Sequence, residues 1–153
     1  MSVVVRSAED IHALVGQKIG SSSWVEVNQE QIDGFADVTG DHQWIHTDPE
    51  RAASGPFGTT IAHGYLTLSL LVPLLDEVLV IENRTSSINY GLDKVRFPAP
   101  VPSGSRVRLT ATLVEAEDVV LGVQVKVDCV LQIDGIERPG CVARAVLRHH
   151  FTT

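Results

Sequence analysis

The stretch from Ile61 to Leu79 constrains the fold most strongly, because it is the longest apolar run in the chain. A helix that is apolar on every face must be buried on all sides, and this run supplies such a helix through Leu66, Leu68, Leu70, Leu71, Val72, Leu74 and Leu75. Polar residues interrupt the run, so it falls short of the roughly 18 apolar residues that a membrane span needs. Pro73 cannot donate a backbone hydrogen bond, and we expect it to kink or break the helix.

The rest of the second half predicts strands. Apolar and polar residues alternate from Ser105 to Leu113, and the clearest alternation runs from Val119 to Ile133. Asp134 and Gly135 form a turn into a final strand, Cys141 to Phe151, and an earlier strand covers about Ser86 to Leu92. Long antiparallel strands with one apolar face, together with one helix that needs burial, predict an α+β fold. We expect a sheet wrapped around that helix.

Composition narrows the class of protein. A chain of 153 residues predicts one domain over residues 1–153, and a net charge of −7 argues against nucleic acid as the main partner. Cys129 and Cys141 lie in apolar runs without metal-ligand spacing, so we interpret them as reduced core thiols. The segment Met1 to Arg6 is too short for the apolar core of a signal peptide. We therefore expect a cytoplasmic protein without membrane insertion.

Ionisable residues concentrate between Thr39 and Gly64. Asp41 and His46 are five residues apart, so a continuous helix would point them about 140° away from each other. They converge if the backbone turns between them, and Gly40 with Asp41 is such a turn signal. A carboxylate and an imidazole aimed at one point form an acid/base pair. Gly64 lies near the start of the apolar helix, where its backbone N–H is open to approach.

Other interpretations of these residues stay open. Asp41 could be a turn residue bonded to its own loop, and His46 a structural histidine. Asp41, His46 and His63 are also ligand types that zinc accepts, although no paired-ligand spacing supports a metal. We expect His42 to face solvent. In the pair His149 and His150, at the end of a strand, consecutive side chains point to opposite faces.

The segment from Phe35 to Pro49, followed by Ala52, Phe57–Gly58 and Ile61–Ala62–His63–Gly64, resembles the MaoC-like dehydratases, which are (R)-specific enoyl-CoA hydratases with the hotdog fold. The run Gly40–Asp41–His42–Gln43–Trp44–Ile45–His46 looks most like the NodN-type branch. A weaker resemblance to the same family extends from Lys94 to Gly104. Many relatives carry Asn-Pro where this chain has Gln43 and Trp44, which leaves acyl-chain preference and loop geometry open.

The resemblance implies a hotdog sheet around the helix from Ala62 to about Leu79, with two subunits pairing into a homodimer. It implies that Asp41 and His46 are the catalytic dyad and that the Gly64 N–H binds the thioester carbonyl. The acyl chain would lie in a tunnel near the subunit boundary. We assign to substrate binding the residues Gln43, Trp44, His63, Tyr65, Lys94 and Arg96.

Each of these binding assignments has an alternative. Lys94 and Arg96, with Arg106 and Arg108, could hold coenzyme A phosphates or form a solvated strand face. Trp44 could line the pocket or pack under the loop.

The leading hypothesis is a lyase of fatty acid metabolism that reversibly hydrates trans-2-enoyl-CoA to (R)-3-hydroxyacyl-CoA, without a metal or redox cofactor. The alternatives are a dehydratase of 3-hydroxyacyl groups on acyl carrier protein, a hotdog thioesterase, and a non-catalytic acyl-thioester binding module.

Overall fold

The computed structural model describes residues 2–151. Its main sheet has the strand order β2-β6-β7-β8-β5, all pairs antiparallel, and β3 also pairs with β6. A second, two-stranded sheet joins β1 to β4 in parallel. The strands are β1 (Val3–Val5), β2 (Lys18–Ser21), β3 (Val25–Val27), β4 (Leu79–Ile81), β5 (Arg84–Arg96), β6 (Ser105–Val119), β7 (Gly122–Ile133) and β8 (Ile136–Phe151).

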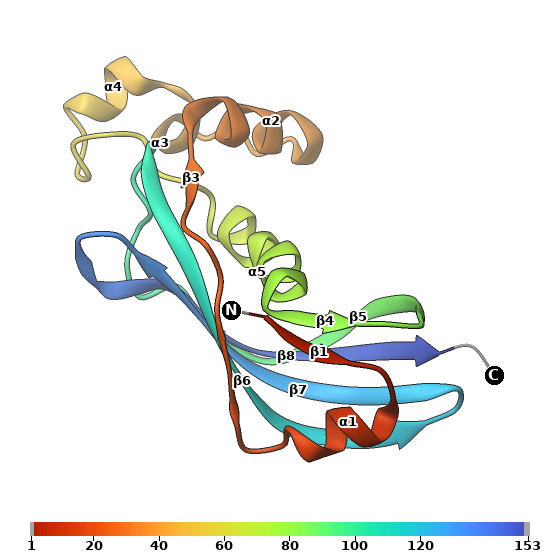
Figure 1. The fold of residues 1–153 in the computed structure, drawn as a ribbon. Coiled ribbons are helices and arrows are strands. Elements are labelled where there is room, and N and C mark those ends of the chain that lie inside the picture. The colour runs from red at the N-terminus through yellow and green to blue at the C-terminus, as the bar shows by residue number, and fades with distance from the viewer. Residues whose placement is uncertain (1, 152–153) are drawn as a thin grey trace.

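One long helix lies across the curved sheet, and three shorter helices gather beyond its N-terminal end (Figure 1). The helices are α1 (Ala8–Ala13), α2 (Gln29–Thr39), α3 (Trp44–Thr47), α4 (Pro49–Ala53) and α5 (Gly64–Val78). Alternate residues of β6, β7 and β8 point toward α5 and are buried with it in one apolar core. The α+β arrangement of a sheet wrapped around a helix is therefore confirmed. Among the described residues, none of the helices has the length and apolarity to cross a membrane.

The central helix departs from the sequence prediction in two ways. The expectation that it is buried on every side is wrong for the single chain, because Tyr65 is 71% exposed and Val72 37% exposed. Of the kink or break expected at Pro73, the break is absent, since α5 continues to Val78. The carbonyl that loses its partner belongs to Ser69, four residues earlier, and both residues are exposed, so water can bond to it.

Strand boundaries also differ from the prediction. The expected strand from Val119 to Ile133 begins instead at Gly122, because a tight turn joins β6 to β7 there. Leu121 occupies the left-handed region of this turn with a φ of 63°, where glycine or asparagine is usual. The apolar alternation of the sequence therefore concealed the turn.

Candidate active site

Helix α2 delivers the chain to Asp41. It begins with a capping box, in which Asn28 accepts from the Gln31 backbone N–H and the Gln31 side chain accepts from the Asn28 N–H. It ends at Gly40, whose φ of 84° is left-handed and turns the chain sharply. The Asp41 carboxylate then accepts a hydrogen bond of 3.3 Å from the Gln43 N–H. The turn predicted between Asp41 and His46 is present.

The His46 imidazole is fixed in one tautomer by a backbone carbonyl. His46 lies in α3 and is only 7% exposed. Its Nδ1 lies 2.7 Å from the Ile61 carbonyl oxygen. A carbonyl only accepts, so Nδ1 carries the proton and donates it, which leaves Nε2 with a free lone pair.

His63, at the N-cap of α5, supports both members of the predicted dyad. Its ring stacks on His46 at a centroid distance of 3.9 Å and lies 4.8 Å from the Phe35 ring on a tilted contact. Its Nε2 donates to the Asp41 backbone carbonyl at 2.9 Å. The opposite nitrogen, Nδ1, is buried and has no hydrogen-bond partner among residues 2–151. His63 thus connects Asp41, His46 and the start of α5 in one contact set.

The three side chains converge. One ring nitrogen of each of His46 and His63 and one carboxylate oxygen of Asp41 all lie within 4.8 Å of one another, and Asp41 remains exposed to solvent. Burial lowers the pKa of His46 below its ordinary value of 6.5, and the neighbouring His63 lowers it further. The Ile61 carbonyl and Asp41 oppose this shift. His46 is therefore a neutral base at pH 7, next to a carboxylate on the solvent side.

Gly64 presents free backbone N–H groups at the start of α5. The first N–H groups of an α-helix have no intrahelical acceptor, and the His63 side chain makes no capping bond to them. A Cβ at residue 64 would lie 3.2 Å from the Phe97 ring, which is tighter than an ordinary contact, so glycine lets the ring lie close without a shift. The helix dipole adds positive potential at the same point. This end of α5 is suited to hold an oxygen that gains negative charge.

The other predicted substrate-binding residues near the loop lie at the edge of the cluster formed by Asp41, His46 and His63. Gln43 is exposed, and its backbone carbonyl accepts from the His46 N–H. Trp44 packs on α4, with the Arg51 guanidinium 4.3 Å from its ring centroid, which favours the packing alternative over a pocket role. Tyr65 is exposed and meets only the edge of the Phe97 ring, at 6.2 Å between centroids.

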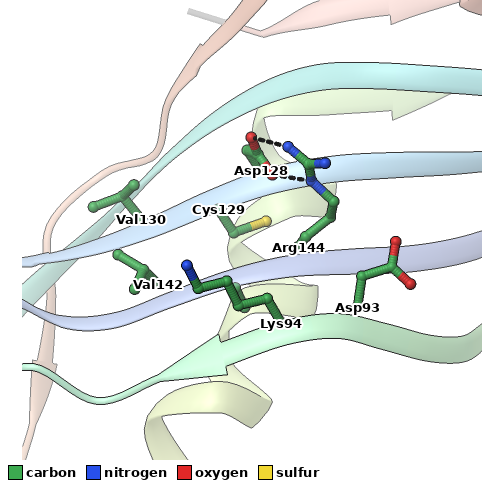
Figure 2. Close-up of a pocket in the computed structure, with 8 residues that line it drawn as sticks. Asp93, Lys94, Asp128, Cys129, Val130, Val142 and Arg144 are labelled. Atoms are coloured by element: carbon green, nitrogen blue, oxygen red, sulfur yellow. Dashed lines mark hydrogen bonds and ion pairs between the residues drawn. The ribbon is translucent and has the colours of Figure 1, made fainter.

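The structure does not bring Lys94 and Arg96 to Asp41 and His46. Their register partners in β8 are Arg144 and Val142, which point away from α5. Figure 2 shows Lys94 on this outer face, beside the ion pair that Arg144 makes with Asp128 at 2.7 Å. An open hollow of about 580 Å³ lies there. The alternative of a solvated strand face therefore fits these two residues better than a coenzyme A site on this subunit.

Gln29 holds the site together and was missed by the sequence analysis. Its Nε2 donates to the His46 carbonyl at 2.7 Å, and its Oε1 accepts from the Thr60 hydroxyl. It therefore joins α2, α3 and the segment before α5. No local pattern marks this role, because both partners are distant in sequence. The Ile61 carbonyl, which fixes the His46 tautomer, was missed for the same reason.

A curved antiparallel sheet wrapped around one long helix is the arrangement of the hotdog fold. The family model described as "MaoC like domain" matches residues 10–132, and the chain belongs to this MaoC-like family.

Two relatives have similar sequences. The 3-hydroxyacyl-thioester dehydratase Z of Mycobacterium tuberculosis is 54% identical over 144 residues, which cover 94% of this chain and 95% of the relative. Nodulation protein N of Rhizobium leguminosarum is 51% identical over 113 residues, 72% of this chain and 70% of the relative, in agreement with the predicted NodN-type branch.

The fold also matches a solved structure. The (R)-hydratase PhaJ1 of Pseudomonas aeruginosa superposes with a TM-score of 0.72 at 23% identity, and the match covers 90% of this chain and 83% of that one. This likeness confirms the hotdog fold.

Proposed function

We propose that the protein is an (R)-specific enoyl-CoA hydratase in which Asp41 and His46 share one water molecule. The observation that carries the proposal is the fixed His46 tautomer beside the Asp41 carboxylate. Both groups accept hydrogen bonds, so a water between them can donate one hydrogen to each. Its oxygen is then left with free lone pairs that can attack C3 of a 2-enoyl thioester.

One proton circulates in this reaction. As the water oxygen bonds to C3, the dyad takes a proton from it, and the electron pair of the double bond shifts toward the thioester carbonyl. The Gly64 N–H stabilises the resulting enolate oxygen, a contribution worth roughly 10²–10³ in rate in other enzymes. The dyad then returns the proton to C2, so the atoms balance without a metal or a redox cofactor. The reverse sequence dehydrates a 3-hydroxyacyl thioester.

The test is the hydration of crotonyl-CoA by variants of the dyad. We expect Asp41→Asn or His46→Gln to lower kcat at least ~10²-fold, because each removes a group that handles the proton. Asp37→Asn and His42→Gln are matched controls, since these side chains form an exposed pair 3.0 Å apart in the same region. Near-normal turnover in the double variant of Asp41 and His46, with an unchanged circular dichroism spectrum, would defeat the assignment.

Assays of the wild type address the remaining alternatives. Activity that survives a chelator supports metal-free chemistry, whereas its loss would assign Asp41, His46 and His63 to a metal. Matched CoA and acyl carrier protein thioesters identify the carrier, and release of free thiol would indicate a thioesterase. A cytoplasmic setting is part of the proposal, supported by the two buried, unpaired thiols of Cys129 and Cys141.

We also propose a homodimer formed through β5. This strand pairs with β8 on one side, and its other edge is open among the described residues. Apolar side chains on it are exposed, among them Ile88 at 48%, Tyr90 at 58% and Leu92 at 45%. An open strand edge of this length pairs readily with a second copy. Light scattering should show a dimer, and Leu92→Lys should shift it toward the monomer.

A further inference from the structure

An apolar groove lies along α5 and begins at Leu68, one helical turn after Gly64. At the start of α5, the Phe97 ring, just after β5, lies against Gly64. The groove itself lies between Leu68 on the helix and Leu92 on the strand, so β5 runs back along α5. It has a volume of about 240 Å³ and is lined mainly by apolar residues: Leu68, Ser69, Leu71, Val72, Asn89, Gly91, Leu92, Ala145 and Leu147.

The far end of the groove contains a few polar groups. A cavity of about 30 Å³ continues it and shares the lining residues Val72, Asn89 and Leu147. His149 and Ser87 line this cavity together with Asp76, among apolar residues of α5 and β4. Its volume is that of one water molecule or one small polar group.

His149, which lines this end, has an unpartnered ring nitrogen. The residue is 3% exposed, and its Nδ1 lies 2.6 Å from the Ser87 hydroxyl oxygen. Its Nε2 is buried without a hydrogen-bond partner among the described residues. Burial and the nearby Arg84 lower the pKa of His149 to about 4, so the ring is neutral at pH 7. A buried polar atom without a partner is unusual in a native protein and needs an explanation.

A hydroxyl group is the ligand that suits this nitrogen. When Ser87 donates to Nδ1, Nε2 carries a proton and donates into the cavity; when Nδ1 donates to Ser87, Nε2 accepts. A hydroxyl both donates and accepts, so it matches either tautomer. A carboxylate fits one tautomer only, and the carboxylate of Asp76, which lines the same cavity and is paired with Arg84 at 3.0 Å, would repel it.

We propose that this groove selects acyl chains that carry a hydroxyl at the distal end, with His149 as the residue that binds it. The inference rests on the proposed function, because it takes the thioester carbonyl to sit at Gly64. From Gly64 to Leu75 the helix rises about 16 Å, at roughly 1.5 Å per residue. With carbon–carbon bonds of about 1.5 Å in a zigzag, an extended chain of about a dozen carbons spans this distance. The substrate class is thus a long-chain ω-hydroxy-2-enoyl thioester.

Binding of saturated thioesters tests the proposal without turnover. Calorimetry compares Kd for ω-hydroxydodecanoyl-CoA and dodecanoyl-CoA in the wild type, His149→Phe and the control His150→Phe. His150 is the matched control because it lies on the opposite face of β8. We expect the hydroxyl to tighten binding about tenfold in the wild type and in the control, a typical gain for one buried hydrogen bond, and not in His149→Phe.

Two results would overturn the proposal. One is an equal hydroxyl preference in His149→Phe and the wild type. The other comes from the wild type alone, measured with thioesters of several chain lengths. The preference for the hydroxylated thioester must be greatest at the length that brings the hydroxyl to His149 Nε2, so an absent preference, or one that does not vary with length, refutes the proposal. Failure of the wild type to hydrate crotonyl-CoA would instead defeat the proposed function. The Kd values for ω-hydroxydodecanoyl-CoA and dodecanoyl-CoA do not depend on turnover, so the two failures can be told apart.

Discussion

The buried His149 predicts that the folded protein loses stability as the pH falls from 6.5 to about 4. Its pKa is about 4 in the folded chain, mainly because of burial, against an ordinary value of 6.5. Between these values the unfolded chain binds a proton that the folded chain does not. The free energy of unfolding therefore rises with pH across this window and falls as the pH is lowered.

The magnitude follows from the two pKa values. One pKa unit corresponds to about 1.4 kcal/mol, so a difference of about 2.5 units corresponds to about 3 kcal/mol once the pH reaches 4. This is a substantial part of the roughly 5–15 kcal/mol that stabilises a typical domain. His46, whose pKa is also lowered by burial, adds to the loss in the same direction. Asp128, whose pKa is lowered by Arg144, loses its contribution at more acidic pH.

Urea denaturation at several pH values between 7 and 4, at one protein concentration, measures this effect. His149→Phe keeps an aromatic ring in the core and cannot be protonated. Between pH 7 and pH 4 its free energy of unfolding should therefore fall by about 3 kcal/mol less than that of the wild type. His150→Phe, on the opposite face, should behave like the wild type. Equal slopes for the wild type and His149→Phe would refute the interpretation of His149 as a buried neutral base.

Three further predictions concern the site and its supports. Because burial lowers the pKa of His46, the acid limb of a kcat/KM profile should fall below pH 6.5, and His46→Gln should abolish that limb. His63→Phe keeps the stacked ring but loses the bond to the Asp41 carbonyl, so kcat should fall about tenfold with little change in KM, as single-turnover assays can check. Asn28→Ala removes the cap of α2 and should lower the unfolding free energy by about 1 kcal/mol in urea, whereas an unchanged midpoint would contradict a role for the capping box.

Local chemistry explains which parts of the fold and site were predictable from sequence. Asn28 and Gln31 specify a capping box within four residues, and Gly40 permits the left-handed turn that aims Asp41 toward His46. The long alternation in β7 specifies which face is buried. Each of these features depends on neighbours in the chain, so a sequence pattern can carry it.

The features that the sequence did not reveal depend on distant partners. Leu121 adopts a positive φ that its residue type disfavours, because the hairpin of β6 and β7 imposes it. Lys94 could not be assigned to a face until the register of β5 with β8 was known. The role of Gln29 arises from contacts with His46 and Thr60, which the fold alone brings near.

The bond from His46 Nδ1 to the Ile61 carbonyl has a consequence for isotope experiments. Since Nδ1 is bonded to the backbone carbonyl, the ring cannot accept a proton at Nε2 and release another from Nδ1 to bulk solvent. A proton that Nε2 accepts must therefore leave from Nε2, which faces the substrate in the proposed mechanism. In the proposed mechanism, tritium that Nε2 takes from C2 during dehydration leaves with the departing water or returns to C2 when the step reverses, so part of it should be found in the substrate pool before it appears in the medium.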